Sequence, residues 1–113
     1  MKLLRTDGRK FRWDGLVGWA YNETTVFPNA SAAYIETTAS HGRIKNTRSD
    51  IVYYVIEGSG KFLVNDQWVP VEQHDVVIIP RETTYDFEAI DSTLKLFLVH
   101  TPAYHPDFDI KDV

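Results

Sequence analysis

Residues 51–62 read IVYYVIEGSGKF and carry the clearest strand signal in the chain. Every residue from Ile51 to Ile56 is β-branched or aromatic, which is typical of a β-strand. Because this run is apolar on both faces, it predicts a central strand that is buried on both sides. The tripeptide Gly58-Ser59-Gly60 that follows predicts the end of this strand.

Weaker strand signals recur at short intervals on both sides of this run, with turn residues between them and almost no helical periodicity. Asn65-Asp66 predicts a hairpin turn. Pro70 has no N–H to donate, so it predicts an edge position for the second strand of that hairpin. The other predicted strands cover residues 32–38, 61–64, 67–71, 76–79, 84–87 and 94–100. Strands at this spacing predict an all-β protein, an antiparallel sandwich or barrel.

The composition is that of a globular protein, and the length of 113 residues predicts one domain over residues 1–113. The net charge is −4 with both signs interspersed, which argues against a nucleic-acid partner. No apolar run approaches the roughly 20 residues that span a membrane, and the first residues do not resemble a signal peptide. We therefore expect a cytoplasmic protein with no membrane partner. The absence of cysteine excludes disulfides, thiolate zinc sites and a cysteine nucleophile.

Two short motifs lie in the middle of the chain. The first, in the region 41–62, is a strand followed by the glutamate-glycine turn Glu57-Gly58 and a hairpin. The second, in the region 74–89, contains Asp75, an apolar strand and Pro80. Both motifs resemble those of the cupin family. The resemblance covers roughly Ala32 to Pro106 and implies a small single-domain cupin, an antiparallel double-stranded β-helix of the jelly-roll type.

The metal ligands of metal-binding cupins are missing from this sequence. In those proteins a His-x-His pair and a glutamate precede the first glycine turn, and a further histidine ends the second motif. The matching positions here hold Ile51 for the glutamate, Lys45 and Thr47 (or Ile44 and Asn46) for the pair, and Tyr85 for the last histidine. Because these side chains are poor ligands for divalent metals, we expect no metal ion and no cofactor.

Three side chains are the main candidates for a site inside the barrel. The resemblance places Tyr53 on the inward face of its strand and Tyr85 in the place of a ligand histidine. His100 shares a face with Leu94, opposite the solvent-seeking Lys95, so we expect it to face the interior as an acid or base. Each of the three could equally be a packed core residue.

Other polar residues are candidates for ligand contact at the mouth of the barrel. Tyr34 could add a further hydroxyl group, and Lys45 and Arg48 could hold a carboxylate or phosphate. The alternative for the two cations is a solvated loop. The remaining histidines are interpreted as surface or loop residues: His41 at the start of a strand or loop, His74 in a turn where relatives carry glycine, and His105 in an acidic C-terminal segment over the surface.

Two functions remain open from the sequence. The first is a metal-independent barrel that binds a small polar ligand, a sugar or an organic acid, in its central cavity. The second is a metal-free sugar isomerase or epimerase in which His100 and Tyr85 move a proton beside a carbonyl group. We also expect a homodimer, with Trp13, Trp19 and Trp68 as candidates for its interface.

Overall fold

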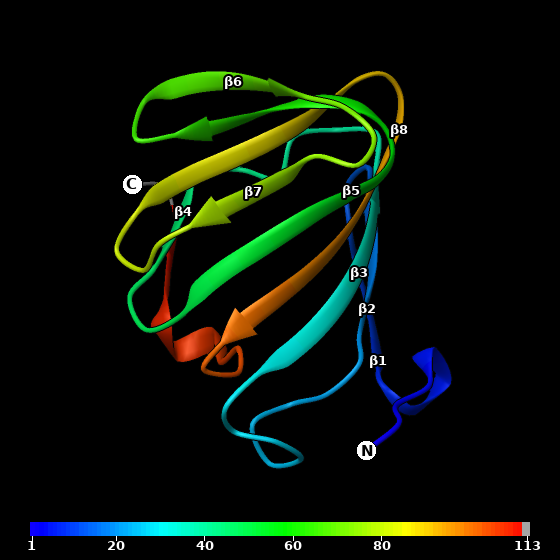
Figure 1. Cartoon of the computed structure of the whole chain (residues 1–113), viewed down its shortest axis with the longest axis vertical. Helices are drawn as coiled ribbons and strands as arrows, with labels where there is room; N and C mark the ends of the chain where they lie inside the picture. The colour runs from blue at the N-terminus through cyan, green and yellow to red at the C-terminus, as the bar shows by residue number, and fades with distance from the viewer. Residues whose placement is uncertain (112–113) are drawn as a thin grey trace.

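The computed structural model describes residues 1–111. These residues form one strongly curled antiparallel sheet, drawn in Figure 1. The strands are β1 (Arg9–Trp13), β2 (Leu16–Ala20), β3 (Ser31–Thr37), β4 (Ile44–Asn46), β5 (Asp50–Val64), β6 (Gln67–Val71), β7 (Val76–Ile79), β8 (Thr84–Thr101) and β9 (Asp109–Lys111), with short 3-10 turns η1 (Arg5–Asp7) and η2 (Pro106–Phe108). No helix among the described residues is long and apolar enough to cross a membrane.

The sheet curls into a half-barrel in which the two longest strands, β5 and β8, pair along their length and each also pairs with different neighbours. The order β1-β2-β3-β8-β4-β9 forms one path, while β5 pairs with β6, β7 and β8. The second half of β8 pairs with β3, and its first residues pair with β4. This arrangement of antiparallel strands confirms the predicted jelly-roll fold of the cupin type.

Strand β5 continues through the glycines that were expected to end it, so this prediction is wrong. Its register with β8 shifts between Val55 and Glu57 and again between Glu57 and Ser59, which marks a bulge. Gly58 has a φ of +90°, and a side chain there would collide with the backbone carbonyl oxygen of Thr93. The glycine thus bends β5 around the barrel without breaking its pairing.

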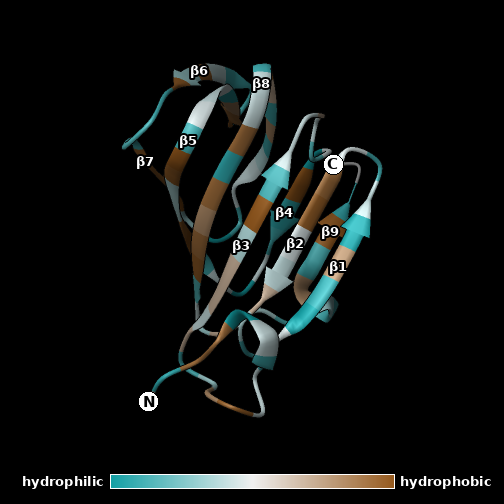
Figure 2. Ribbon diagram, turned by 90° about the vertical axis from the view of Figure 1, so that its right-hand side faces the viewer, coloured by the Kyte–Doolittle hydropathy of each residue, from teal (hydrophilic) through white to brown (hydrophobic). Residues whose placement is uncertain are grey.

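The central strand is buried on one face only, which corrects the prediction of burial on both sides. Ile51, Tyr53 and Val55 are at most 1% exposed, whereas Val52 and Tyr54 on the opposite face are 38% and 36% exposed. Figure 2 shows hydrophobic stretches interrupted by hydrophilic bands along β5 and β8, so the two faces of residues 51–55 differ in burial more than in hydropathy. The sheet therefore has a closed inner face and an outer face that meets solvent.

The turn residues behave as their positions require. Asn65 and Asp66 have φ values of +48° and +65°, as a two-residue hairpin turn of type I′ needs. Strand β6 pairs with β5 alone, so Pro70 lies on an edge strand as predicted. His74 has a φ of +78°, which explains why the cupin motif has glycine at this position.

The core lies inside the curl of the sheet. It consists of aliphatic and aromatic side chains from β2 to β8, and the bulkiest of those that are fully buried are Tyr53, Phe62 and Phe87. The three rings contact one another at centroid distances of 5.1, 5.5 and 5.2 Å. This aromatic cluster also borders the polar side chains, since Tyr53 bonds to Tyr85 and Phe87 packs against His41.

Candidate functional site

Tyr53, Tyr85 and His100 all lie on the inner face of the sheet. Tyr53 is paired with Leu98, and Ile51 is paired with His100, so the inward residues of β5 face those of β8 across the ladder. Tyr85 stands at the other end of β8, beside Ile44 of β4. The exposed fractions of Tyr53, Tyr85 and His100 are 1%, 4% and 8%.

The two inward tyrosines form a hydroxyl pair. Their Oη atoms are 3.1 Å apart. Burial raises the pKa of both phenols, so both are neutral at pH 7. One hydroxyl proton forms the hydrogen bond between the two tyrosines. The other hydroxyl proton has no protein acceptor within residues 1–111. The pair can therefore donate a hydrogen bond to a ligand but is a poor base.

His41 places an imidazole beside this pair. From the sequence, His41 was expected at the start of a strand or loop. Its half-buried ring stacks on Tyr85 at a centroid distance of 5.7 Å and packs against Phe87 at 4.6 Å. Nδ1 lies 3.0 Å from the carbonyl oxygen of Gly42. Because a carbonyl only accepts, Nδ1 carries the proton and Nε2 keeps its lone pair. Burial is the main cause that lowers the pKa of His41, so Nε2 is available as a base near neutral pH.

The buried carboxylate of Asp86 holds the segment that carries His41. Asp86 accepts hydrogen bonds from the Ser40 hydroxyl at 3.1 Å and from the backbone N–H of Gly42 at 2.8 Å. The His41 N–H also donates to the carbonyl of Phe87 at 2.8 Å. His41 is thus fixed on both sides along the chain. The sequence offered one hint, since His41 opens the first motif region, but its partners lie some 45 residues away on β8.

His100 is the second imidazole of the inner face. Its ring packs edge-on against Tyr104 at 5.1 Å. Burial, helped by the neighbouring His41, lowers the pKa of His100 to about 4, so it is neutral at pH 7. Within the part of the chain that the structure describes, no protein group makes a hydrogen bond to this ring. Its nitrogens therefore remain available for water or a ligand.

The C-terminal segment contributes a carboxylate that the sequence analysis missed. We expected residues 105–113 to lie over the surface, and Asp112 and Val113 fall outside the described residues. Strand β9 instead pairs with β4 and places Asp109 opposite Asn46. Asp109 accepts hydrogen bonds from Asn46 Nδ2 and from the Tyr104 hydroxyl, both at 2.8 Å. A short acidic tail carries no periodic pattern that would reveal this contact.

We call His41, Tyr53, Tyr85, His100 and Asp109 the inner cluster. Three other residues predicted to contact the ligand lie away from it. Tyr34 lies on the outer face of β3, where its hydroxyl donates to Glu36 at 2.7 Å. Lys45 is 3.8 Å from Glu82, and the Arg48 guanidinium lies over the Phe108 ring at 5.0 Å. The cluster thus consists of neutral rings and one carboxylate, without the cations expected at its mouth.

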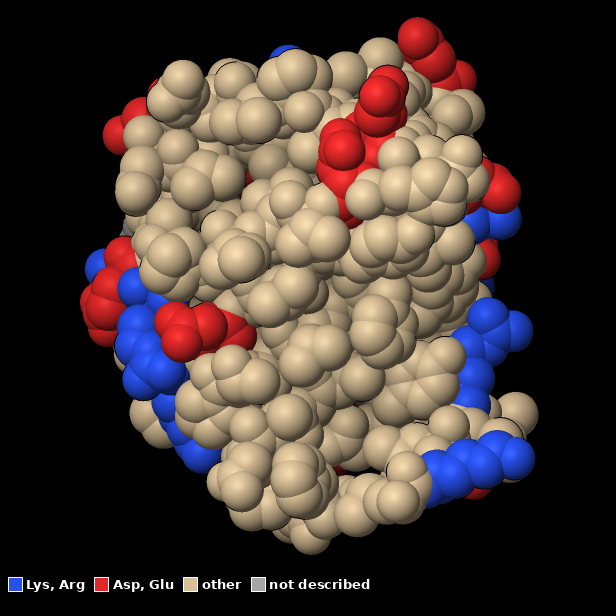
Figure 3. Space-filling model, viewed as in Figure 1, with Lys and Arg blue, Asp and Glu red and all other residues tan. Residues whose placement is uncertain are grey.

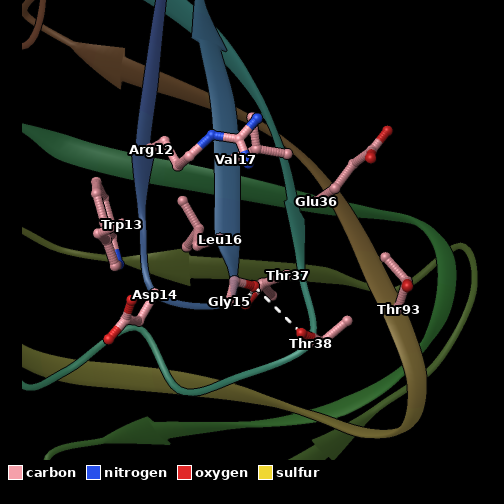
Figure 4. Close-up of a pocket in the computed structure, with 10 residues that line it drawn as sticks. All are labelled: Arg12, Trp13, Asp14, Gly15, Leu16, Val17, Glu36, Thr37, Thr38 and Thr93. Carbon is pink, nitrogen blue, oxygen red and sulfur yellow. Dashed lines mark hydrogen bonds between the residues drawn. The ribbon is translucent and has the colours of Figure 1, made fainter.

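A hollow of about 530 Å³ lies beside the cluster, along the β1–β2 hairpin. Figure 4 shows the residues of the hairpin, of β3 and of β8 that line it. Trp13, Asp14 and Glu36 are among its lining residues, whereas His41, Tyr85 and His100 are not. Trp13 joins the two regions, because its ring also packs edge-on against His41 at 5.7 Å.

The positions that hold a metal in metal-binding cupins offer no ligand set here. Ile51 is an aliphatic core residue, and Tyr85 is a neutral phenol bonded to Tyr53. Among residues 1–111, no group of three or more His, Cys, Asp or Glu side chains is placed to hold a metal ion.

Comparisons with known proteins agree with this fold. The family described as "Cupin domain" matches residues 33–100. A histidine-to-glutamine variant of Streptomyces Pac13, solved with uridine, superposes with a TM-score of 0.88 at 22% identity, covering 99% of this chain and 90% of that one. Pac13 itself is described as a nucleoside dehydratase (TM-score 0.87, 23% identity, covering 98% and 89%). KdgF from Halomonas sp. superposes with a TM-score of 0.79 at 14% identity, covering 95% and 96%. A search of curated proteins with the sequence finds no match.

Proposed function

The chain belongs to the cupin family, and on that premise we propose that it binds a nucleoside at its inner cluster and removes water from it without a metal ion. The observation that carries the proposal is the arrangement of His41, Tyr85 and Tyr53, an imidazole with a free Nε2 against a pair of neutral phenols. Pac13 structures with uridine include variants of one histidine and of two tyrosines, the same residue types.

The chemistry requires only an acid and a base. His41 Nε2 takes a proton from a carbon that a neighbouring carbonyl group makes acidic. The electron pair of that C–H bond forms a C=C bond as the C–O bond to a hydroxyl on the next carbon breaks. The imidazolium of His41 returns the proton to the departing hydroxyl, which leaves as water. The unused phenol proton of the tyrosine pair donates to the carbonyl oxygen, where negative charge develops.

An isomerase or epimerase remains the second candidate. The observation that favours it is a second neutral imidazole, His100, close enough for His41 to influence its pKa. One imidazole would remove a proton and the other would return it to the same carbon. Turnover in D₂O separates the two functions, since an epimerase incorporates deuterium into its substrate and product without loss of water.

Binding and turnover can be tested with one set of variants. We expect uridine to raise the thermal unfolding temperature of the wild-type protein, and a nucleoside with an oxidised sugar carbon to lose water in the presence of a chelator. His41→Gln should slow that reaction about 100-fold or more, measured by mass spectrometry of the product. Tyr85→Phe should also slow it, because the phenol pair loses a hydroxyl.

Tyr54→Phe is the matched control for Tyr85→Phe. Tyr54 lies on the outer face, where its hydroxyl contacts His74 at 2.6 Å, so its loss should leave turnover unchanged. A protein that neither binds uridine nor dehydrates a carbonyl-bearing nucleoside, or one that loses its activity on chelation, would contradict the proposal.

We also propose that a second copy of this chain covers part of the outer face. Val52, Tyr54, Val76 and Ile78 of β5 and β7 form an outer apolar patch, with exposed fractions of 38%, 36%, 56% and 62%. Figure 3 shows a broad area without charged side chains across the middle of this view. Such a patch can meet its own copy across a two-fold axis without burying charge.

This interface differs from the tryptophan surface suggested by the sequence. Trp13 packs against Phe11 and His41 on the inner side of the sheet. Trp19 stacks on Tyr34 with the Arg5 guanidinium 4.6 Å above its ring. Trp13 and Trp68 are themselves 43% and 41% exposed, but the outer apolar patch joins four exposed apolar side chains on two paired strands, so we favour it for contact between copies.

A further inference from the structure

Building on the proposed function, we propose that Asp109 recognises the sugar of the ligand by accepting hydrogen bonds from two adjacent hydroxyl groups. The proposal makes Asp109 the residue that distinguishes a ribose-like diol from a deoxy sugar. It goes beyond the acid–base chemistry of His41, because it assigns a binding role to the C-terminal strand β9.

The carboxylate of Asp109 is held in place by both of its oxygens. Oδ1 accepts from Asn46 Nδ2 and Oδ2 accepts from the Tyr104 hydroxyl, each at 2.8 Å. Asn46 is itself fixed, since its Oδ1 accepts from the backbone N–H of Ser49 at 2.6 Å. Each carboxylate oxygen can accept a second hydrogen bond. Because Asp109 is only half-buried, these remaining acceptor sites can be reached by a ligand.

The surroundings of Asp109 connect it to the proposed catalytic groups. Tyr104, which donates to Asp109, packs its ring against His100, a nine-tenths buried imidazole without a protein hydrogen bond among the described residues. The charge of Asp109 also contributes to the raised pKa of Tyr85 and opposes the lowering of the pKa of His41. Strand β4 joins the two regions, because its Ile44 stands opposite Tyr85 of β8 and its Asn46 stands opposite Asp109 of β9.

A vicinal diol fits these acceptors by its chemistry. Each hydroxyl group carries one proton to donate, and the two oxygens of a carboxylate can receive two parallel hydrogen bonds, as they do from other paired donors. Hydrogen bonds to a charged acceptor are stronger than those between neutral groups. An analogue that lacks the hydroxyls leaves Asp109 partly desolvated, with Asn46 and Tyr104 as partners but without the two hydrogen bonds from the ligand, and such an analogue is rejected strongly.

The test compares three ligands on the wild-type protein by calorimetry: uridine, 2′-deoxyuridine and 2′,3′-dideoxyuridine. We expect the dissociation constant to rise about 10-fold or more from the first to the last. If uridine itself fails to bind, the proposed function is contradicted. If uridine binds and the dideoxy compound binds equally well, the role of Asp109 is contradicted while the nucleoside site stands.

The variant Asp109→Asn then assigns the effect to this residue. An amide keeps the shape of the side chain and an oxygen for Asn46, but it loses the charge and one acceptor. We expect uridine to bind more weakly and the preference over dideoxyuridine to fall to about twofold or less. Asp107→Asn is the matched control, because Asp107 lies two residues earlier and is exposed. Discrimination that survives in Asp109→Asn, or that falls equally in Asp107→Asn, would overturn the assignment.

Discussion

Two adjacent tyrosines of β5 have opposite environments. Tyr53 is 1% exposed, touches Phe62 and Phe87, and bonds to the hydroxyl of Tyr85. Tyr54 is 36% exposed and its hydroxyl contacts His74 in a surface turn. The difference follows from the alternation of side chains along a strand, so each tyrosine belongs to a different face of the sheet.

The comparison shows how a small barrel can combine a core and a site on one face. The inner face of β5 and β8 supplies both the aromatic core and the neutral polar groups near His41. The outer face carries no comparable cluster among the described residues and leaves the outer apolar patch open to solvent. Substitutions on the inner and outer faces should therefore have effects that differ both in the property affected and in magnitude.

The largest difference is expected in the free energy of unfolding. Phe62→Ala removes a ring that is 0% exposed and leaves a cavity, which should cost about 3–5 kcal/mol. Ile78→Ala on the outer face, at 62% exposure in the single chain, should cost less than about 1 kcal/mol at concentrations low enough to keep the protein monomeric. Urea unfolding followed by circular dichroism measures both. Equal losses would show that the outer face is buried in solution.

The second effect is a dependence of stability on pH that comes from the inner face. The pKa of His100 is about 4 in the folded protein, below its value of about 6.5 in an unfolded chain. The unfolded state therefore binds the proton first as the pH falls. The free energy of unfolding is therefore highest above pH 6.5, and protonation of His100 in the unfolded state lowers it by about 3 kcal/mol as the pH falls towards 4. The lowered pKa of His41 acts in the same direction.

Variants assign this pH dependence to one histidine. His100→Gln should flatten the loss of stability between about pH 6.5 and 4, measured by urea unfolding at a series of pH values. Thr101→Ser, at the exposed position next to His100, keeps every imidazole and should leave the slope as it is in the wild type. A slope that is unchanged in His100→Gln would show that the imidazole is not buried in solution.

The smallest effect on the stability of the single chain is expected for a charge on the outer apolar patch. Ile78→Lys should change the free energy of unfolding by less than about 0.5 kcal/mol, since the side chain is exposed. It should nevertheless shift a dimer to a monomer in light scattering, because two copies would have to bury a charge at their contact. A wild-type protein that is monomeric at high concentration would contradict the proposed interface.

Much of the fold could be predicted from the sequence, because the signals are local. The run from Ile51 to Ile56, the Asn65-Asp66 turn and the edge proline Pro70 each reflect the preferences of a few neighbouring residues. The two cupin motifs gave the topology and the loss of the metal ligands. The inward placement of His100 followed from alternation along a strand, and that of Tyr53 from the cupin resemblance.

The site itself was decided by tertiary structure. His41 is fixed by Asp86 and stacks on Tyr85, and Asp109 meets Asn46 from the far end of the chain. These contacts join segments that are tens of residues apart, and they depend on how the register of β5 and β8 curls the sheet. No local preference encodes that register, because side chains that alternate along one strand do not specify which residues stand opposite on another. The sequence thus determined the strands and the absent metal ligands, while the pairing of distant strands determined which polar groups meet.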